Sequence, residues 1–168
     1  MGALSIRKRK MEIKIKNLQI KVPLNHNQIK AQIKAILLKE KIKDANLCFV
    51  FVGHQTIRAF NRKFLKRNYA TDVLAFESEF DHWIKRKNQA IAGDIVISTD
   101  AALKNHKEFK TTVSEELALY IIHGILHLIG YDDHNKKDIL KMRKKECELM
   151  DVLGDKVQKI ITVNVSRG

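Results

Sequence analysis

The sequence predicts an α/β (α+β) fold with a single mixed sheet of about four strands that is packed with helices. Two observations lead to this prediction. Short runs of β-branched and aromatic residues alternate along the chain with segments whose apolar residues recur every three or four positions. The sequence also contains no internal repeat and no low-complexity linker. We therefore expect a basic N-terminal arm over residues 1–10 and one domain over residues 11–168.

The first part of the chain is expected to supply two strands and two helices. Residues 11–16, MEIKIK, alternate apolar and charged side chains, which is typical of a half-exposed strand. A turn at Pro23 precedes residues 26–41, where isoleucine and leucine recur at helical spacing and predict an amphipathic helix. The apolar run at 46–52, NLCFVFV, predicts a buried strand, and residues 54–66 return to helical spacing.

Two further strands are expected on either side of a polar stretch. Residues 71–77, TDVLAFE, and residues 92–98, AGDIVIS, are both typical of strands. Residues 79–89 between them, EFDHWIKRKNQ, are polar and charged and predict a loop or a hairpin tip. Gly93 lets another part of the backbone approach closely, as glycine inside a strand commonly does.

The last third of the chain is expected to be mostly helical. A short helix is predicted from residue 100 to 109, and an apolar core helix follows within residues 114–134. Residues 135–153 predict a charged helix with one apolar side. The tail at 159–166, KIITVNVS, is compatible with a short edge strand or with disorder.

Composition narrows the class of protein. A net charge of +13 and a pI of about 9.8 predict attraction to polyanions, nucleic acid first and anionic membrane second. The alternative is a lysine-rich surface that only keeps the protein in solution. No apolar run approaches the roughly 20 residues of a transmembrane helix, and the N-terminus lacks the apolar core of a secretory signal. We therefore expect a cytoplasmic protein with no membrane partner, in which Cys48 and Cys147 are reduced thiols.

The helix within residues 114–134 carries the strongest functional signal. His123 and His127 are four residues apart, so both imidazoles project from one face of the helix. Gly130 ends the helix, and the chain then turns so that His134 can face the first two histidines. Three imidazoles around one point suit a zinc ion with an open fourth position, one per chain. The alternative is that these histidines are ordinary core residues, although burying imidazoles in so apolar a helix requires partners.

The two histidines also resemble the H-E-x-x-H helix of zincin metalloproteases. Position 124 is glycine here, where that motif has the glutamate that acts as general base. We therefore expect a zincin-like metal helix that lacks the usual protease base.

Three stretches of the sequence resemble the bacterial YbeY family. The motif HGILHLIGYDDH at 123–134 is similar to the family signature H-G-x-L-H-L-x-G-Y-D-H. The run FNRKFLKRNYATDVLAF at 60–76 is similar to the segment L-N-x-x-Y-R-x-x-x-x-x-T-D-V-L-S-F, and AGDIVIS is similar to G-D-I-x-I-S. The order and spacing of the three stretches agree over most of residues 11–153.

This resemblance implies a metal-dependent endoribonuclease that is specific for single strands and acts in ribosomal RNA maturation. It implies processing at the 3′ end of 16S ribosomal RNA, a role in ribosome quality control, and a mixed α/β fold with the metal helix beneath a groove. The implied partners are single-stranded RNA, ribosomal RNA and the small ribosomal subunit, and the expected cofactor is Zn²⁺.

The sequence departs from the family pattern at two places. Asp133 stands where the family has its third histidine, and His134 comes one residue later. We expect His134 to be the third metal ligand, with Asp133 as the alternative because carboxylates also bind zinc. Leu65 stands where the family has an arginine that is thought to contact RNA, and Lys66 or Arg67 beside it is expected to replace that arginine.

The expected catalytic residues are His123, His127 and Asp132. Either a metal-activated water or the RNA 2′-OH attacks the phosphodiester, and the sequence leaves both open. Asp132 either orients a ligand histidine or only shapes the turn. The residues expected to bind the substrate are Lys63, Lys66, Arg67 and Thr71. The alternative for the three basic residues is a solvated charged face.

Two other functions remain as alternatives. One is a non-catalytic protein that associates with RNA or the ribosome and holds a structural zinc ion. The other is a zincin-like metallohydrolase with a different substrate. The missing glutamate at position 124 and the basic charge, which suits few peptides, argue against the second alternative.

Overall fold

The structure, a computed structural model, describes residues 10–78 and 90–162. The predicted hairpin tip at 79–89, residues 1–9 of the predicted arm and the end of the tail lie outside these ranges. In chain order the elements are β1 (Met11–Asn17), α1 (His26–Lys39), β2 (Asp44–Val52), α2 (His54–Leu65), β3 (Val73–Glu77), β4 (Ala90–Ser98), α4 (Thr99–Phe109), α5 (Val113–Ile129), α6 (Lys136–Leu153) and the 3₁₀ helix η2 (Gly154–Ile160). Each predicted strand and helix is present, with bounds that differ by at most two residues.

The strands form one mixed sheet in the order β1-β2-β4-β3. β1, β2 and β4 are parallel to one another, whereas β3 runs antiparallel to β4 and lies at an edge. This arrangement confirms the predicted single mixed sheet of four strands. β3 begins at Val73, later than expected, because the side chain of Asp72 accepts the Val73 backbone N–H at 2.8 Å and holds residues 71 and 72 in the preceding turn.

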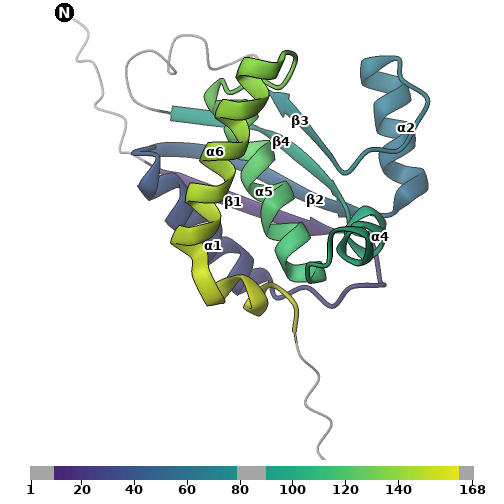
Figure 1. Cartoon of the computed structure of the whole chain (residues 1–168), viewed down its shortest axis with the longest axis horizontal. Helices are drawn as coiled ribbons and strands as arrows, with labels where there is room; N and C mark the ends of the chain where they lie inside the picture. The colour runs from purple at the N-terminus through teal and green to yellow at the C-terminus, as the bar shows by residue number, and fades with distance from the viewer. Residues whose placement is uncertain (1–9, 79–89, 163–168) are drawn as a thin grey trace, which may run out of the picture.

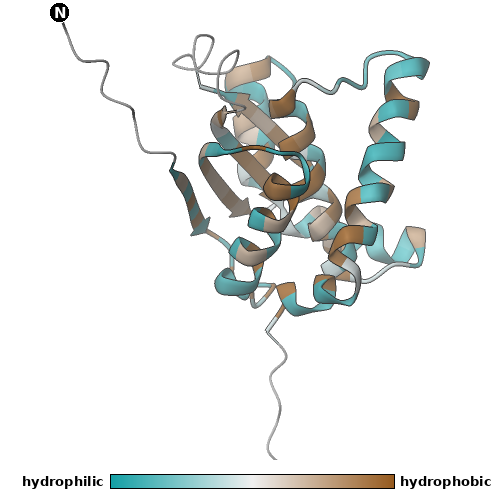
Figure 2. Cartoon of the chain, turned by 90° about the vertical axis from the view of Figure 1, so that its left-hand side faces the viewer, coloured by the Kyte–Doolittle hydropathy of each residue, from teal (hydrophilic) through white to brown (hydrophobic). Residues whose placement is uncertain are grey.

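Helices cover the two faces of the sheet unequally (Figure 1). α1 and α5 cover one face, where Phe49, Phe51 and Ile95 are fully buried, and α6 packs on these two helices. α2 packs on the other face, where Ile57 lies in a smaller apolar cluster with Val96. Alternate side chains of each strand point to opposite faces, so both clusters draw on the same strands. In Figure 2 the hydrophobic residues gather in the strands, and the hydrophilic residues lie mainly on the outer helices.

α5 is the central helix of the fold, and its two ends are well defined. Thr112 and Glu115 form a capping box at its start, and Gly130 ends it in the left-handed region at φ +113°, as the sequence predicts. Most of its residues are buried. Gly124 brings the helix close to the sheet, because a Cβ at that position would lie 2.6 Å from the Cγ2 of Ile95 on β4. The helix is therefore held against β4 by close packing.

The tail after α6 returns to the start of α1. Ile161 forms an antiparallel bridge with Leu24, and the Asn25 N–H donates to the Ile160 carbonyl at 2.7 Å. Thr162 donates likewise to Pro23 at 2.8 Å. The described part of the tail is thus paired, whereas the sequence left an edge strand and disorder as equal alternatives.

The structure also shows the apolarity of the helices and the state of the two cysteines. Within the described residues, no single helix is long and apolar enough to span a membrane. The helices α4 and α5 have the required length and apolarity only when they are taken together, and they are bent by 116° relative to each other. Cys48 on β2 and Cys147 on α6 are both free thiols.

Candidate metal centre

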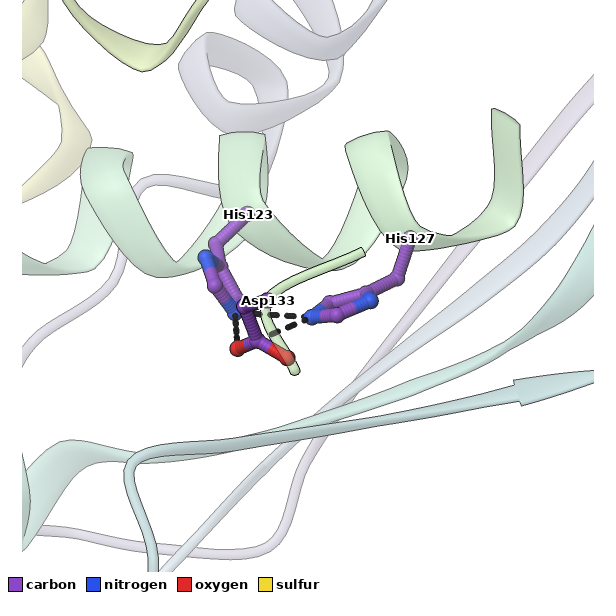
Figure 3. A group of neighbouring side chains, drawn as sticks. All are labelled: His123, His127 and Asp133. Atoms are coloured by element: carbon purple, nitrogen blue, oxygen red, sulfur yellow. Dashed lines mark hydrogen bonds and ion pairs between the residues drawn. The ribbon is translucent and has the colours of Figure 1, made fainter. Parts of the chain in front are cut away.

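The two histidines of α5 face one another, as their spacing predicts. His123 Nε2 lies 2.9 Å from His127 Nε2, and the two rings meet edge to face (Figure 3). Both side chains are about one-quarter exposed, at 23% and 28%, so the nitrogens open toward a cleft. α5 positions them because its C-terminal turns lie beside the edge strand β3.

Asp133 supplies the third donor of this group. Its Oδ2 lies 3.6 Å from the Nε2 of His123 and 3.6 Å from the Nε2 of His127 (Figure 3). Two ligands of a tetrahedral zinc ion with bonds of about 2.1 Å lie about 3.4 Å apart. The two distances to Asp133 are near this value, whereas the 2.9 Å between the histidine nitrogens is shorter. The three donors thus lie close enough to hold one metal ion, and two imidazoles with one carboxylate are a common ligand set for zinc.

His134 lies outside this group in the structure. Its side chain is 76% exposed, and its Nδ1 contacts the Oδ1 of Asp132. The alternative ligand, Asp133, is thus the one that the backbone turn brings to His123 and His127, whereas His134 as third ligand stays a prediction. Asp132 Oδ1 contacts Nδ1 of His134 and also accepts the backbone N–H of Asp133 at 2.8 Å. Both expected roles of Asp132, orienting a ligand histidine and shaping the turn, therefore stay predictions.

Glu146 on α6 is a site residue that the sequence analysis missed. Its Oε1 accepts a hydrogen bond of 2.6 Å from Nδ1 of His123, and its side chain is only 14% exposed. A proton held on Nδ1 leaves the Nε2 lone pair free to face Asp133 and His127. The only signal in the sequence is an acidic residue on the inner side of a charged helix, which is too common to identify it.

The two histidines differ in the shift of their pKa values. Burial lowers the pKa of His123, but the hydrogen bond and charge of Glu146 and the charges of Asp133 and Asp72 outweigh this and raise it above its ordinary value. Burial, together with the neighbouring His123, holds the pKa of His127 below its ordinary value. The environment therefore favours the neutral form of His127 and the protonated form of His123.

Position 124 offers no space for a general base. The glycine packs on Ile95, so a side chain there would meet the sheet before it reached the metal group. The close packing of α5 on β4 therefore requires glycine at the position where the H-E-x-x-H motif has glutamate. This argues against a metalloprotease-like base and agrees with the sequence analysis.

A cleft of about 450 Å³ opens beside the three donors. Arg67 and Thr71, two of the expected substrate-binding residues, line it together with Leu65, Tyr69 and Asp72. Neither Lys63 nor Lys66 is among the described lining residues. Lys63 Nζ instead lies 5.2 Å from the centre of the Phe64 ring, and Lys66 Nζ lies 3.5 Å from the Lys63 carbonyl.

The wall of the cleft opposite α5 is held in shape by short-range hydrogen bonds. Thr71 Oγ1 donates to Asp72 at 3.2 Å. The buried Asn61 donates through Nδ2 to the Tyr69 carbonyl at 2.8 Å, which ties the loop to α2. Asp72 therefore shapes the turn that precedes β3. Asn61 lines the same cleft and was not predicted.

Comparison with known proteins gives a consistent result. The model of the family described as endoribonuclease YbeY matches residues 10–154. A protein named endoribonuclease YbeY from Syntrophus aciditrophicus is 36% identical over 148 residues, which cover 85% of this chain and 90% of that protein. The protein of the same name from Carboxydothermus hydrogenoformans is 31% identical, over 83% of this chain and 96% of its own length. A Thermotoga maritima protein solved in solution superposes with a TM-score of 0.59 at 27% identity, over 85% of this chain and 90% of that one.

Proposed function

The chain belongs to the endoribonuclease YbeY family, and from this membership we propose that it cleaves single-stranded ribosomal RNA with the help of one metal ion held by His123, His127 and Asp133. Family membership makes it an endoribonuclease. The observation that supports the metal is the convergence of three donor atoms, 2.9 to 3.6 Å apart, at the mouth of a cleft. Zn²⁺ is the proposed ion because it accepts nitrogen and carboxylate ligands in this number.

A zinc ion held by His123, His127 and Asp133 would polarise a phosphoryl oxygen and lower the pKa of a water molecule, so that hydroxide would be available near neutral pH. The side chains of this chain provide the rest. Glu146 holds His123 with Nε2 facing the cleft, and Asp133 adds the negative charge that a divalent cation requires. Arg67, on the opposite wall, places a guanidinium where it neutralises the phosphate of the RNA backbone. Thr71 offers a hydroxyl beside it.

The size of the cleft and the basic charge of the whole chain support a nucleic-acid strand as substrate. A volume of about 450 Å³ is within the roughly 300–1,000 Å³ of pockets that hold small ligands, so the cleft has room for a nucleotide-sized part of a strand. The net charge of +13 supports a polyanionic partner.

We extend the proposal to 16S ribosomal RNA 3′-end maturation and ribosome quality control, and to the small ribosomal subunit as partner, because the resemblance to the family implies these roles.

The test combines metal content with cleavage. We expect the purified chain to bind about one equivalent of zinc and to cut a single-stranded 16S RNA 3′-end fragment, but not the same fragment paired with its complement. Chelation and His123→Ala should each lower the rate more than about 100-fold, since each removes the ion or a ligand. Asp133→Ala should lose more zinc affinity than His134→Ala, because only Asp133 lies with the two histidines.

The matched control is His26→Ala, which removes an exposed histidine at the start of α1, far along the chain from the cleft. It should bind zinc and cleave like the unchanged chain. Tightly held zinc with no cleavage by any of these proteins would favour a structural metal instead. A larger loss of zinc affinity in His134→Ala than in Asp133→Ala would make His134 the third ligand.

A further inference from the structure

We propose that the outer face of α2 is a second binding surface for RNA, which holds the phosphates of the strand after it leaves the metal cleft. This proposal rests on the proposed function, because it extends the path of the same substrate. The surface, here called the α2 pocket, is a hollow of about 390 Å³ lined by Gln55, Arg58, Ala59, Arg62 and Asn68. In Figure 1, α2 stands at the right-hand margin of the molecule, away from α1, α5 and α6.

The α2 pocket concentrates positive charge that no neighbouring acid in the sequence offsets. Arg58 and Arg62 are four residues apart, so both project from one face of α2, and both are exposed. None of the lining residues is acidic, and the sequence has no Asp or Glu between Asp44 and Asp72. Two like charges at this spacing repel each other in the free protein. A phosphate between them relieves that repulsion, which makes an anion the ligand that fits.

One of the two arginines is already positioned. Arg58 Nε donates a hydrogen bond of 3.1 Å to Asn68 Oδ1, which fixes the plane of the guanidinium beside the loop. The remaining N–H donors of Arg58 stay available, since a guanidinium has five. A preordered guanidinium loses less side-chain entropy on binding a phosphate than a free one.

The α2 pocket and the metal cleft share a wall. Along the loop after α2, Arg67 and Tyr69 line the metal cleft, whereas Asn68 between them lines the α2 pocket. Arg62 likewise lines the α2 pocket, and Leu65 lines the cleft. A strand that crosses this loop would pass from Arg67 in the cleft to Arg58 and Arg62 in the α2 pocket.

An aromatic side chain lies on the same wall. Tyr69, which lines the metal cleft, is 53% exposed. Arg67 Nη1 lies 3.5 Å from the Tyr69 hydroxyl, so the ring and the guanidinium are neighbours. Exposed rings beside basic groups are what proteins use to stack the bases of a single strand. The wall therefore suits bases as well as phosphates.

Two other sides of the cleft carry carboxylates in the described part of the chain. Asp133 lies at the metal side of the cleft, and Asp132 lies next to it. A hollow that shares Thr71 and Asp72 with the cleft also contains Asp100. Carboxylates on these sides repel phosphate, so the basic wall is the exit that electrostatics favours.

The experiment compares two RNA lengths in an Arg58→Gln, Arg62→Gln double variant. A short oligonucleotide fills only the metal cleft, whereas a longer single strand also reaches the α2 pocket. We expect the affinity for the long RNA to fall about 10-fold or more at 0.1 M salt, and the slope of log affinity against log salt to become shallower by about 1.4, since each single-strand phosphate contact contributes about 0.7. Affinity and cleavage rate for the short RNA, and zinc content, should stay unchanged.

The control variant is Lys34→Gln, Lys39→Gln, which removes the same charge from exposed positions on α1, on the opposite face of the sheet. It should bind the long RNA nearly as well as the unchanged chain. Arg62→Gln alone preserves the bond from Arg58 to Asn68, so a loss of long-RNA affinity in this single variant reports lost charge and not a displaced loop.

Two results would overturn the proposal. One is equal affinity of the double variant and the unchanged chain for the long RNA, and the other is an equal loss in the α1 control. Failure of the proposed nuclease function would look different. The unchanged chain would then cleave neither RNA, while the binding measurements would still decide whether the α2 pocket holds the strand.

Discussion

Glu146 determines which nitrogen of His123 faces the cleft. An imidazole can carry its proton on either nitrogen, and only the neighbour of the ring decides between them. Glu146 accepts from Nδ1 at 2.6 Å, and Nε2 is left for the metal group. The contact comes from α6, which crosses α5 on its outer side (Figure 1). The two histidines of the motif thus depend on a carboxylate 23 residues after His123.

We expect Glu146→Ala to weaken zinc binding about 10- to 100-fold, because His123 loses the partner that orients it. Glu146→Gln should lose less, since its amide oxygen still accepts a hydrogen bond from Nδ1. A competition titration against a zinc indicator measures both. The matched control is Glu148→Ala, which removes a carboxylate of the same helix that contacts only Lys145 among the described residues. Unchanged affinity in Glu146→Ala would contradict this role.

At the scale of elements, the position of α5 on the sheet sets the site. Gly124 lets the helix approach β4, and Gly93 on β4 lets the β3 backbone approach β4 at Phe76. A Cβ at Gly93 would also lie 3.1 Å from Leu128 of α5. These two glycines hold α5, β4 and β3 close together, and the cleft lies between α5 and β3. The expectation that Gly93 permits close backbone approach is confirmed.

Gly124→Ala should lower the free energy of unfolding by about 1–3 kcal/mol, because the added methyl group overpacks against Ile95. Urea unfolding measures the change. The control is a double-mutant cycle with Ile95→Ala, which removes the atoms that the methyl group would meet. Gly124→Ala should then cost less in the Ile95→Ala background than in the unchanged chain. An equal cost in both backgrounds would show that the contact with Ile95 is not the cause.

At the scale of the whole molecule, Asp100 joins three distant segments. Its Oδ1 accepts from Lys21 Nζ at 2.7 Å, and its Oδ2 accepts from the backbone N–H of His54, at the start of α2, at 2.8 Å. These two hydrogen bonds hold the pKa of Asp100 below its ordinary value. The carboxylate therefore links the N-terminus of α4 to the N-terminus of α2 and to the loop after β1.

This link predicts how stability depends on pH. A carboxylate whose pKa is lower in the folded chain stabilises it above the ordinary pKa of about 3.9, and that contribution disappears as the pH falls through the lower, folded value. Asp100→Asn should therefore cost about 1 kcal/mol near pH 7. The difference from the unchanged chain should shrink below about pH 4. Urea unfolding across this range measures it.

The control for this prediction is Asp151→Asn, which removes an exposed carboxylate of α6 and should leave the free energy of unfolding at pH 7 almost unchanged. A cost of Asp100→Asn that stayed constant down to pH 3 would contradict the role of its charge.

The sequence by itself determined the elements and part of the site. Apolar periodicity is local, so it predicted the strands and helices to within two residues, the left-handed end at Gly130, and the pairing of His123 with His127 one helical turn apart. The family and its endoribonuclease activity also followed from local motifs, and the comparisons confirmed both.

Only the tertiary structure decided the remaining features. In the folded chain Asp133 lies beside the two histidines, and Glu146 accepts a hydrogen bond from His123. Arg67 and Thr71 line the cleft, whereas Lys63 and Lys66 are not among its described lining residues. Some of these contacts join segments that are far apart in the chain, so they depend on how α5 packs on the sheet and α6 packs on α5. The contact of Asp133 depends on the path of the backbone after Gly130. The spacing of residues along the sequence does not predict these contacts, because the burial of a side chain and its distance from other segments depend on how the whole chain packs.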